Sequence, residues 1–133
     1  MPLGLENIDP KQNEEYFRTM MTAEVDAVTV IGAMQKGEDD FQIVDVRDED
    51  SYEKGHVKGA VNIPIEEISK RMDELDKNKG VLVYCYDPPC MVSVKAARIL
   101  SGEGFKVKDV GGGFENFQKN NAPIEKGTEA VAR

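Results

Sequence analysis

Short apolar runs alternate with helical patterns along most of the chain. Runs of β-branched and other apolar residues predict buried strands, at Phe41–Val46, Ala60–Ile63, Val81–Tyr84 and Phe105–Val110. The segments between and after them predict helices, at Val30–Lys36, Asp50–Lys54, Ile65–Leu75, Ser93–Leu100 and Phe114–Lys119. Because strands alternate with helices, we expect an α/β fold with a doubly wound parallel sheet and helices on both faces.

The sequence also predicts where the domain begins and ends. Asn13–Met21 carries aromatic and methionine residues on one helical face, so we expect an N-terminal helical extension over residues 1–21 that packs against the domain. The domain itself is expected over residues 22–126, with Thr29 as the N-cap of its first helix. The polar residues 127–133 are expected to form a flexible tail.

Composition narrows the class of protein. At 133 residues, 40% of them hydrophobic and 32% charged, the chain suits one soluble globular domain. A formal net charge of -8 without a basic patch disfavours binding to nucleic acid. No apolar run is long enough to span a bilayer, and Met1–Pro10 lacks the pattern of a signal peptide. We therefore expect a cytoplasmic protein with no membrane partner.

Chemically informative residues follow three of the predicted strands. Asp45 lies at the end of the first, Cys85 directly follows Val81–Tyr84, and Gly111–Gly113 follows the last. The carboxyl ends of parallel strands meet at one edge of a sheet, where ligands bind. The sequence therefore predicts a functional site at this edge.

Cys85 lies between a strand and a helix, a position that suits a reactive thiol. Backbone amides and a helix N-terminus lower a thiol pKa and also hold an anionic persulfide. We expect amides to surround this sulfur within reach of solvent. The active-site loop that follows consists of Tyr86, Asp87, Pro88, Pro89, Cys90, Met91, Val92 and Ser93. The alternative is an inert core cysteine, since free cysteine is often buried.

Two geometries of this loop fit the sequence. In the first, the chain curls around the Cys85 sulfur before the helix begins. In the second, Asp87 caps the helix, the two prolines occupy its first turn, and Cys90 lies in that turn. The sequence does not separate them.

Ordered motifs from about Thr22 to Glu125 resemble the rhodanese-like family. They are Asp45–Val46–Arg47, Tyr52–Pro64, Val83–Tyr84–Cys85, Ser93–Ala97 and Gly112–Gly113–Phe114. The resemblance implies a five-stranded sheet and a catalytic cysteine at Cys85 that accepts sulfane sulfur as a persulfide. It also implies a small sulfur donor (a persulfide or thiosulfate), a thiol or protein acceptor, and no cofactor.

The chain departs from the family pattern at the loop. Family members commonly have a shorter loop with an arginine just before the serine, whereas Cys85 precedes Ser93 by eight positions with no arginine between. An anionic donor loses its usual basic contact and Asp87 adds repulsion, so we expect a small persulfide or a protein partner as donor. The customary tryptophan after the glycines is missing, and Phe117 is its nearest substitute.

Several neighbours have candidate supporting roles. Asp45 and Arg47 suit an ion pair that braces the loop. The sole histidine, His56, suits a hydrogen-bonding, architectural role better than that of a general base. Lys95 either supports a bound anion or is simply solvated. Cys90 is a candidate resolving thiol that attacks a modified Cys85, or it packs beneath the loop.

Rival functions remain open. The two cysteines suit a thiol-disulfide redox switch, and the fold alone would suit a non-catalytic binding module. A phosphatase of the related fold needs an arginine six positions after the cysteine, where Met91 stands. No metal site is expected, because two cysteines and one histidine are too few ligands.

Overall fold

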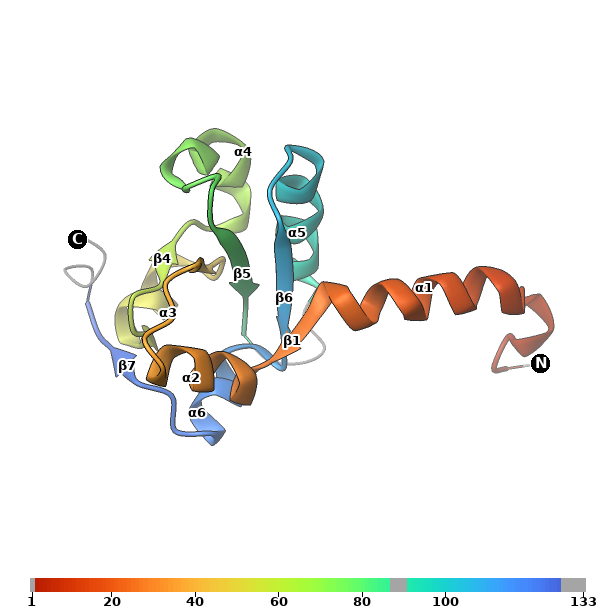
Figure 1. Cartoon of the computed structure of the whole chain (residues 1–133), viewed down its shortest axis with the longest axis horizontal. Helices are drawn as coiled ribbons and strands as arrows, with labels where there is room; N and C mark the ends of the chain where they lie inside the picture. Colours follow the sequence, from red (N-terminus) through yellow and green to blue (C-terminus); the bar gives the residue numbers. More distant parts are fainter. Residues whose placement is uncertain (1, 87–90, 128–133) are drawn as a thin grey trace.

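Five parallel strands form the central sheet of the protein (Figure 1). The computed structural model describes residues 2–86 and 91–127. Across the sheet the strands follow the order β1 (Glu24–Asp26), β6 (Val107–Gly111), β5 (Gly80–Tyr84), β2 (Phe41–Asp45) and β4 (Val61–Asn62). Each pairing between neighbours is parallel, which confirms the predicted five-stranded parallel sheet.

Helices connect these strands. The α-helices are α1 (Pro10–Ala23), α2 (Ala27–Gln35), α3 (Glu49–Lys54), α4 (Ile68–Arg71), α5 (Val92–Gly102) and α6 (Gly113–Lys119). Three short 3-10 helices are η1 (Leu5–Asn7), η2 (Ile65–Glu67) and η3 (Met72–Glu74). A separate antiparallel pair joins β3 (His56–Val57) to β7 (Ile124–Glu125).

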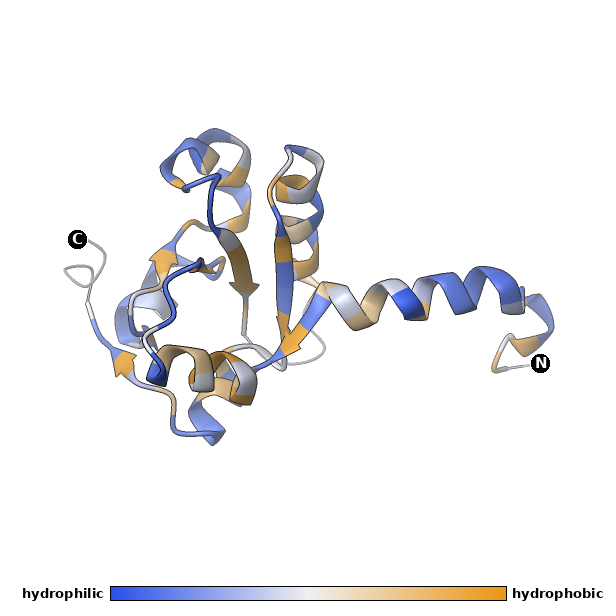
Figure 2. Ribbon diagram, in the orientation of Figure 1, coloured by the Kyte–Doolittle hydropathy of each residue, from blue (hydrophilic) through white to orange (hydrophobic). Residues whose placement is uncertain are grey.

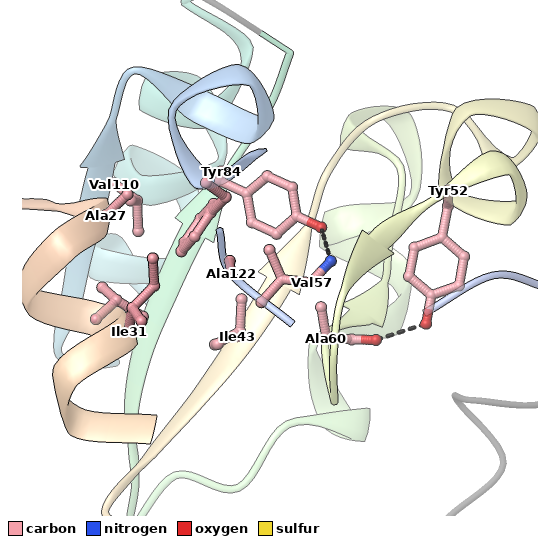
Figure 3. Packing of buried hydrophobic residues seen from close by; sticks show 11 residues of the cluster. Ala27, Ile31, Ile43, Tyr52, Val57, Ala60, Tyr84, Val110 and Ala122 are labelled. Atoms are coloured by element: carbon pink, nitrogen blue, oxygen red, sulfur yellow. Dashed lines mark hydrogen bonds between the residues drawn. The ribbon is translucent and has the colours of Figure 1, made fainter. Parts of the chain in front are cut away.

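Two apolar cores lie on opposite faces of the sheet. On one face α2, α3 and α6 pack over Ile43 and Tyr84 (Figure 3). On the other face α4 and α5 pack over Val44 and Val83. Successive strand residues point to opposite faces, so β2 and β5 supply both cores and read as continuous apolar runs. In Figure 2, β5 is largely hydrophobic, whereas β6 is hydrophilic along its middle. The doubly wound arrangement is confirmed.

The start of α2 differs from the prediction. Asp26, not Thr29, is its N-cap, because the Asp26 carboxylate accepts a hydrogen bond from the Thr29 N–H at 2.8 Å. Hydrogen bonding to the Thr29 side chain, followed by the bond from the Thr29 N–H, lowers the pKa of Asp26 below its ordinary value. The helix begins at Ala27, earlier than predicted, because β1 ends at Asp26. The sequence did not predict β1, because Val25 is the sole apolar residue in this strand.

The predicted helix Ile65–Leu75 is broken into η2, α4 and η3. Ile68 and Leu75 are nevertheless buried in the core beneath α5, and Ile65 and Met72 pack against it. The apolar spacing therefore identified the buried face correctly. It could not separate α from 3-10 turns, because residues three apart share a face in both.

α1 projects away from the rest of the protein and buries none of its residues (Figure 1). The prediction that it packs against the domain is therefore wrong. The helix forms because Asp9 caps it by accepting the Lys11 N–H and Pro10 begins its first turn. The domain bounds 1–21, 22–126 and 127–133 stay a prediction, and residues 128–133 lie outside the described part. Among the described residues, no helix combines the length and apolarity needed to cross a membrane.

Candidate functional site at the carboxyl edge of the sheet

Three segments meet at the carboxyl edge of the sheet. Asp45 ends β2 and lies in register with Tyr84, the last residue of β5. Cys85 follows at once, and its carbonyl oxygen accepts a hydrogen bond from the Phe114 N–H at 2.8 Å. The predicted convergence of Asp45, Cys85 and Gly111–Gly113 is therefore confirmed.

Cys85 lies deep in this edge. The residue is 2% exposed and belongs to the apolar core beneath α5. Its sulfur lies 3.5 Å from the Ser93 hydroxyl oxygen, within hydrogen-bonding range. Cys85 is disulfide-bonded in the structure. In this state its sulfur lacks the solvent access that the sequence analysis expected.

The loop after Cys85 is only partly described. The predicted loop residues outside the described part are Asp87, Pro88, Pro89 and Cys90. The expected ring of amides therefore stays a prediction. α5 begins at Val92 with Met91 as its N-cap. The alternative geometry involves Asp87 and Cys90, which lie outside the described residues, so it stays a prediction.

Ser93 links Cys85 to a carboxyl group on β6. Ser93 is 3% exposed, and its hydroxyl also hydrogen-bonds the side chain of Asp109. Burial raises the pKa of Asp109, and the hydrogen bond from Ser93 offsets part of that rise. Within the described residues, Asp109 Oδ1 has no hydrogen-bond partner. The sulfur is thus connected through one hydroxyl to a carboxyl that holds a proton more readily than usual.

The glycine turn after β6 packs directly against the backbone that follows Cys85. Gly113 has φ 58°, and a Cβ there would lie 2.6 Å from the Tyr86 carbonyl oxygen and 2.8 Å from that of Cys85. Only glycine combines the left-handed conformation with so close an approach. The turn lets α6 begin beside the active-site loop.

A buried ion pair braces the end of β2. Arg47 donates from Nε to Asp45 Oδ1 at 3.0 Å and from an Nη to Oδ2 at 2.7 Å. The Tyr84 hydroxyl donates to the same Oδ2 at 2.6 Å and accepts the Val57 N–H at 3.1 Å. Burial, followed by the Asp45 charge, raises the pKa of Tyr84. The predicted bracing contact is present.

Arg47 is fully committed to structural contacts. It is 4% exposed, donates to the Gly55 carbonyl oxygen at 2.7 Å and lies 4.1 Å from the centre of the Phe114 ring. Burial lowers the pKa of Arg47, but its hydrogen bonds and the Asp45 charge more than offset this, so the pKa is raised. A guanidinium with these partners has little capacity left for an anionic substrate.

Tyr86, the first loop residue, is anchored to the start of α3. Its hydroxyl donates to Asp48 Oδ2 and accepts the Asp48 N–H at 3.3 Å. Asp48 also caps α3 by accepting the Ser51 N–H at 2.8 Å. These bonds, that of Tyr86 above all, lower the pKa of Asp48 to about 2.

His56 makes the buried stacking and hydrogen-bonding contacts that the predicted architectural role requires. Its ring is fully buried and stacks on Tyr52 with centroids 3.6 Å apart. Nδ1 lies 2.8 Å from the Tyr52 carbonyl oxygen, so Nδ1 carries the proton. Nε2 lies 3.8 Å from Glu125 Oε1. His56 therefore joins α3 to β7.

The remaining candidates lie around the site. Lys95 is exposed on α5. Phe117 is fully buried and packs edge-on against Tyr84 with centroids 5.3 Å apart, whereas Phe114 contacts Arg47. Over residues 2–86 and 91–127, no group of three or more acidic, histidine or cysteine side chains is placed to hold a metal ion.

Sequence reasoning missed three residues of the site. Tyr84 and Phe114 belong to motifs that carry the family resemblance, but the sequence predicts no contact at the site for either residue. Asp109 was not singled out, although a carboxylate two positions before a glycine run at the end of a buried strand is unusual. That unusual position is the signal that could have identified it.

A family model described as the rhodanese-like domain matches residues 27–120. The chain belongs to this family. Rhodanese-like structures share its fold. BH2092 of Bacillus halodurans has a TM-score of 0.79 at 30% identity, over 89% of this chain and 87% of that one. The rhodanese-like domain of Alr3790 from Anabaena sp. has a TM-score of 0.71 at 29% identity, over 78% and 79% of the two chains.

Curated relatives include a thiosulfate sulfurtransferase and a transcriptional regulator. The chain is 40% identical over 83 residues to thiosulfate sulfurtransferase GlpE of Coxiella burnetii, covering 62% of this chain and 76% of GlpE. It is 32% identical over 103 residues to the HTH-type transcriptional regulator Rv0324 of Mycobacterium tuberculosis, covering 77% of this chain. The chain spans 46% of that regulator, less than half of its length. At the level of the family, these relatives support a sulfurtransferase-type function.

Proposed function

We propose that this rhodanese-like protein carries sulfane sulfur as a persulfide on Cys85. The observation that carries the proposal is the position of Cys85, which directly follows the central strand β5 and contacts Ser93 in the first turn of α5. A helix N-terminus favours an anion, whether a thiolate or a persulfide. The likeness to a thiosulfate sulfurtransferase supports the same chemistry.

Transfer takes place in two displacements. The Cys85 thiolate attacks the outer sulfur of a donor persulfide; a sulfur–sulfur bond forms to Cys85, and the bond to the donor breaks, which releases the donor thiolate. An acceptor thiolate then attacks the outer sulfur on Cys85, leaves as the new persulfide and restores the Cys85 thiolate. No net oxidation occurs, and the sole prior requirement is reduction of the disulfide at Cys85.

Ser93 and Asp109 position the protons for these steps. While Asp109 is ionised, the Ser93 hydroxyl donates to it and presents its oxygen to the Cys85 S–H. When Cys85 loses its proton and Asp109 gains one, the same hydroxyl turns its hydrogen to the sulfur anion. The raised pKa of Asp109 favours this exchange. Ser93 thereby stabilises both states of Cys85.

A persulfide suits this site better than thiosulfate. Arg47 is neutralised by Asp45, and the sequence supplies no arginine between Cys85 and Ser93. Asp87 follows Cys85 by two positions in a chain of net charge -8. A doubly charged donor therefore meets more repulsion than a small persulfide whose outer sulfur carries one charge.

Transfer kinetics test this proposal. The reduced protein is supplied with cysteine persulfide or with thiosulfate, and persulfide formation on a thiol acceptor is followed. We expect turnover that disappears in Cys85→Ser, persists in the matched control Cys90→Ser, and is faster with the persulfide. Turnover by Cys85→Ser, or none by the reduced wild type, contradicts the proposal.

The disulfide at Cys85 supports a second function, a thiol-disulfide switch that uses Cys85 and Cys90. In that case hydrogen peroxide oxidises one thiol to a sulfenic acid and releases water, the second thiol attacks that sulfur and displaces a second water to form the disulfide, and a dithiol restores both thiols. Rapid oxidation with no persulfide on Cys85 favours the switch over sulfur transfer. The absence of both reactions favours a binding module.

A further inference from the structure

The N-terminal arm, defined as residues 3–21, exposes an unusual amount of apolar side chain. Its exposed large hydrophobic residues, with exposed fractions between 47% and 82%, are Leu3, Leu5, Ile8, Tyr16, Phe17 and Met21. Tyr16 and Phe17 stack edge-on, with ring centroids 5.4 Å apart. Figure 2 shows hydrophobic residues both at the tip of the arm and toward its base. Exposed apolar surface of this extent marks an interaction site.

An apolar groove lies at the base of this arm. It has a volume of about 440 Å³, and apolar side chains make up most of its wall. Its lining consists of Thr22, Val25, Thr29, Val30, Ala33, Asp40, Phe41, Gly80, Val81, Leu82, Lys106, Val107 and Lys108. The groove exists because the short α2 covers the carboxyl half of this face and leaves Phe41 and Leu82 partly exposed.

The arm cannot fill the groove of its own chain. α1 ends at Ala23 and β1 begins at Glu24, so no linker separates the helix from the sheet. A helix that continues directly into a paired strand cannot fold back over the base of that strand. The occupant of the groove must therefore come from elsewhere.

We propose that two copies of this chain form a two-fold dimer in which each arm covers the groove of the other copy. Tyr16 and Phe17 occupy the middle of α1, so antiparallel helices meet there on the axis. α1 is about 21 Å long at 1.5 Å per residue, so its tip then reaches the base of the partner helix. Ile8 and Leu5 enter the partner groove beside Val25.

Charge complementarity supports this arrangement over other occupants. Glu6 and Asp9 lie at the acidic tip of the arm, and Lys106 and Lys108 lie at the rim of the groove. Arg18 is paired with Glu14 of its own helix at 2.7 Å, so it takes no part in the contact between copies. The contact between tip and rim is repeated by the two-fold symmetry, as a closed dimer requires.

Light scattering during size-exclusion chromatography of the full chain tests the dimer. We expect a dimer for the wild type, a monomer for Phe17→Glu, and a dimer for the control Ile124→Glu. Ile124 is also an exposed apolar residue (37%), but it lies on β7, far from the arm (Figure 1). Circular dichroism shows whether each variant is folded. A monomeric wild type, or a folded Phe17→Glu that stays dimeric, overturns the proposal.

Two further variants test the geometry. Glu6→Lys and Lys108→Glu should each weaken the dimer at least fivefold, and the double exchange should restore most of the affinity. Tyr16→Cys, made with Cys85→Ser and Cys90→Ser, should form a disulfide-linked dimer on mild oxidation because residue 16 lies at the axis. Failure of both the rescue and the cross-link contradicts the antiparallel arrangement. These readouts do not depend on sulfur transfer, so the two proposals fail separately.

Discussion

The Ser93 hydroxyl oxygen lies 3.5 Å from the Cys85 sulfur, which ties the end of β5 to the first turn of α5. Replacing Ser93 with alanine removes a hydrogen bond worth about 1 kcal/mol. We therefore expect Ser93→Ala to slow persulfide formation on reduced Cys85 by roughly fivefold, since 1.4 kcal/mol is about tenfold in rate. Ser101→Ala, an exposed serine near the other end of α5, is the control. Equal rates in the two variants would remove Ser93 from the mechanism.

Gly113 and Gly59 give a matched pair for the glycine turn. Both have positive φ, 58° and 84°, but nothing lies within 4 Å of a Cβ on Gly59, whereas one on Gly113 meets the Tyr86 and Cys85 carbonyl groups. Gly59→Ala should cost roughly 1–2 kcal/mol from the left-handed conformation alone. Gly113→Ala should cost clearly more and should slow sulfur loading. Urea denaturation measures the loss of stability in each variant. Equal losses would show that a Cβ on residue 113 does not clash with the Tyr86 and Cys85 carbonyl groups.

The Tyr84 hydroxyl should contribute measurably to stability. Tyr84→Phe removes the bond to Asp45 and leaves the buried Val57 N–H without its acceptor. An unsatisfied buried donor costs roughly 1–3 kcal/mol, so we expect the free energy of unfolding to fall by this amount. Ser101→Ala, which also removes one hydroxyl but at an exposed position of α5, should change it by less than about 0.5 kcal/mol. An unchanged free energy of unfolding in Tyr84→Phe would show that another group accepts the hydrogen bond of the Val57 N–H.

Asp48 should make stability depend on acid pH. Its folded pKa of about 2 is below the ordinary 3.8, so its contribution is complete above the ordinary pKa and is lost as pH falls toward 2. Asp48→Asn keeps a good N-cap but removes the charge. The difference in unfolding free energy between wild type and variant should therefore shrink as pH falls through this range.

Tyr86→Phe tests the cause of this shift. Loss of the Tyr86 hydroxyl should move the pKa of Asp48 back toward its ordinary value, because that hydrogen bond is its largest cause. An NMR titration of the Asp48 carboxyl carbon reports the change directly. An unchanged titration would assign the low pKa to the Ser51 contacts alone.

The sequence predicted the parts of the fold that depend on local pattern. β2 and β5 are buried on both faces, so their apolar residues predicted both strands clearly. The carboxyl ends of these two parallel strands then placed Asp45 and Cys85 close together. β1, β3 and β7 have two or three residues each and exist because a distant segment pairs with them. No local signal specifies such a strand.

At the site, the sequence predicted contacts only between residues that are close together along the chain. The pairing of Asp45 with Arg47 was predictable because the two are close in sequence. The contacts of Tyr84 with Val57 and of Ser93 with Asp109 join residues far apart in sequence, so they appear only after folding. The outward course of α1 was missed because amphipathic spacing shows which face is apolar but not what covers it.

The state of the Cys85 sulfur is the central question, and the intact mass of the reduced protein measures it most directly. After incubation with glutathione persulfide, the wild type and Cys90→Ser should each gain the mass of one sulfur atom, and Cys85→Ser should gain none. Brief treatment with a dithiol should remove the gain. A gain that survives in Cys85→Ser, or a wild-type mass that does not increase, contradicts a persulfide on Cys85.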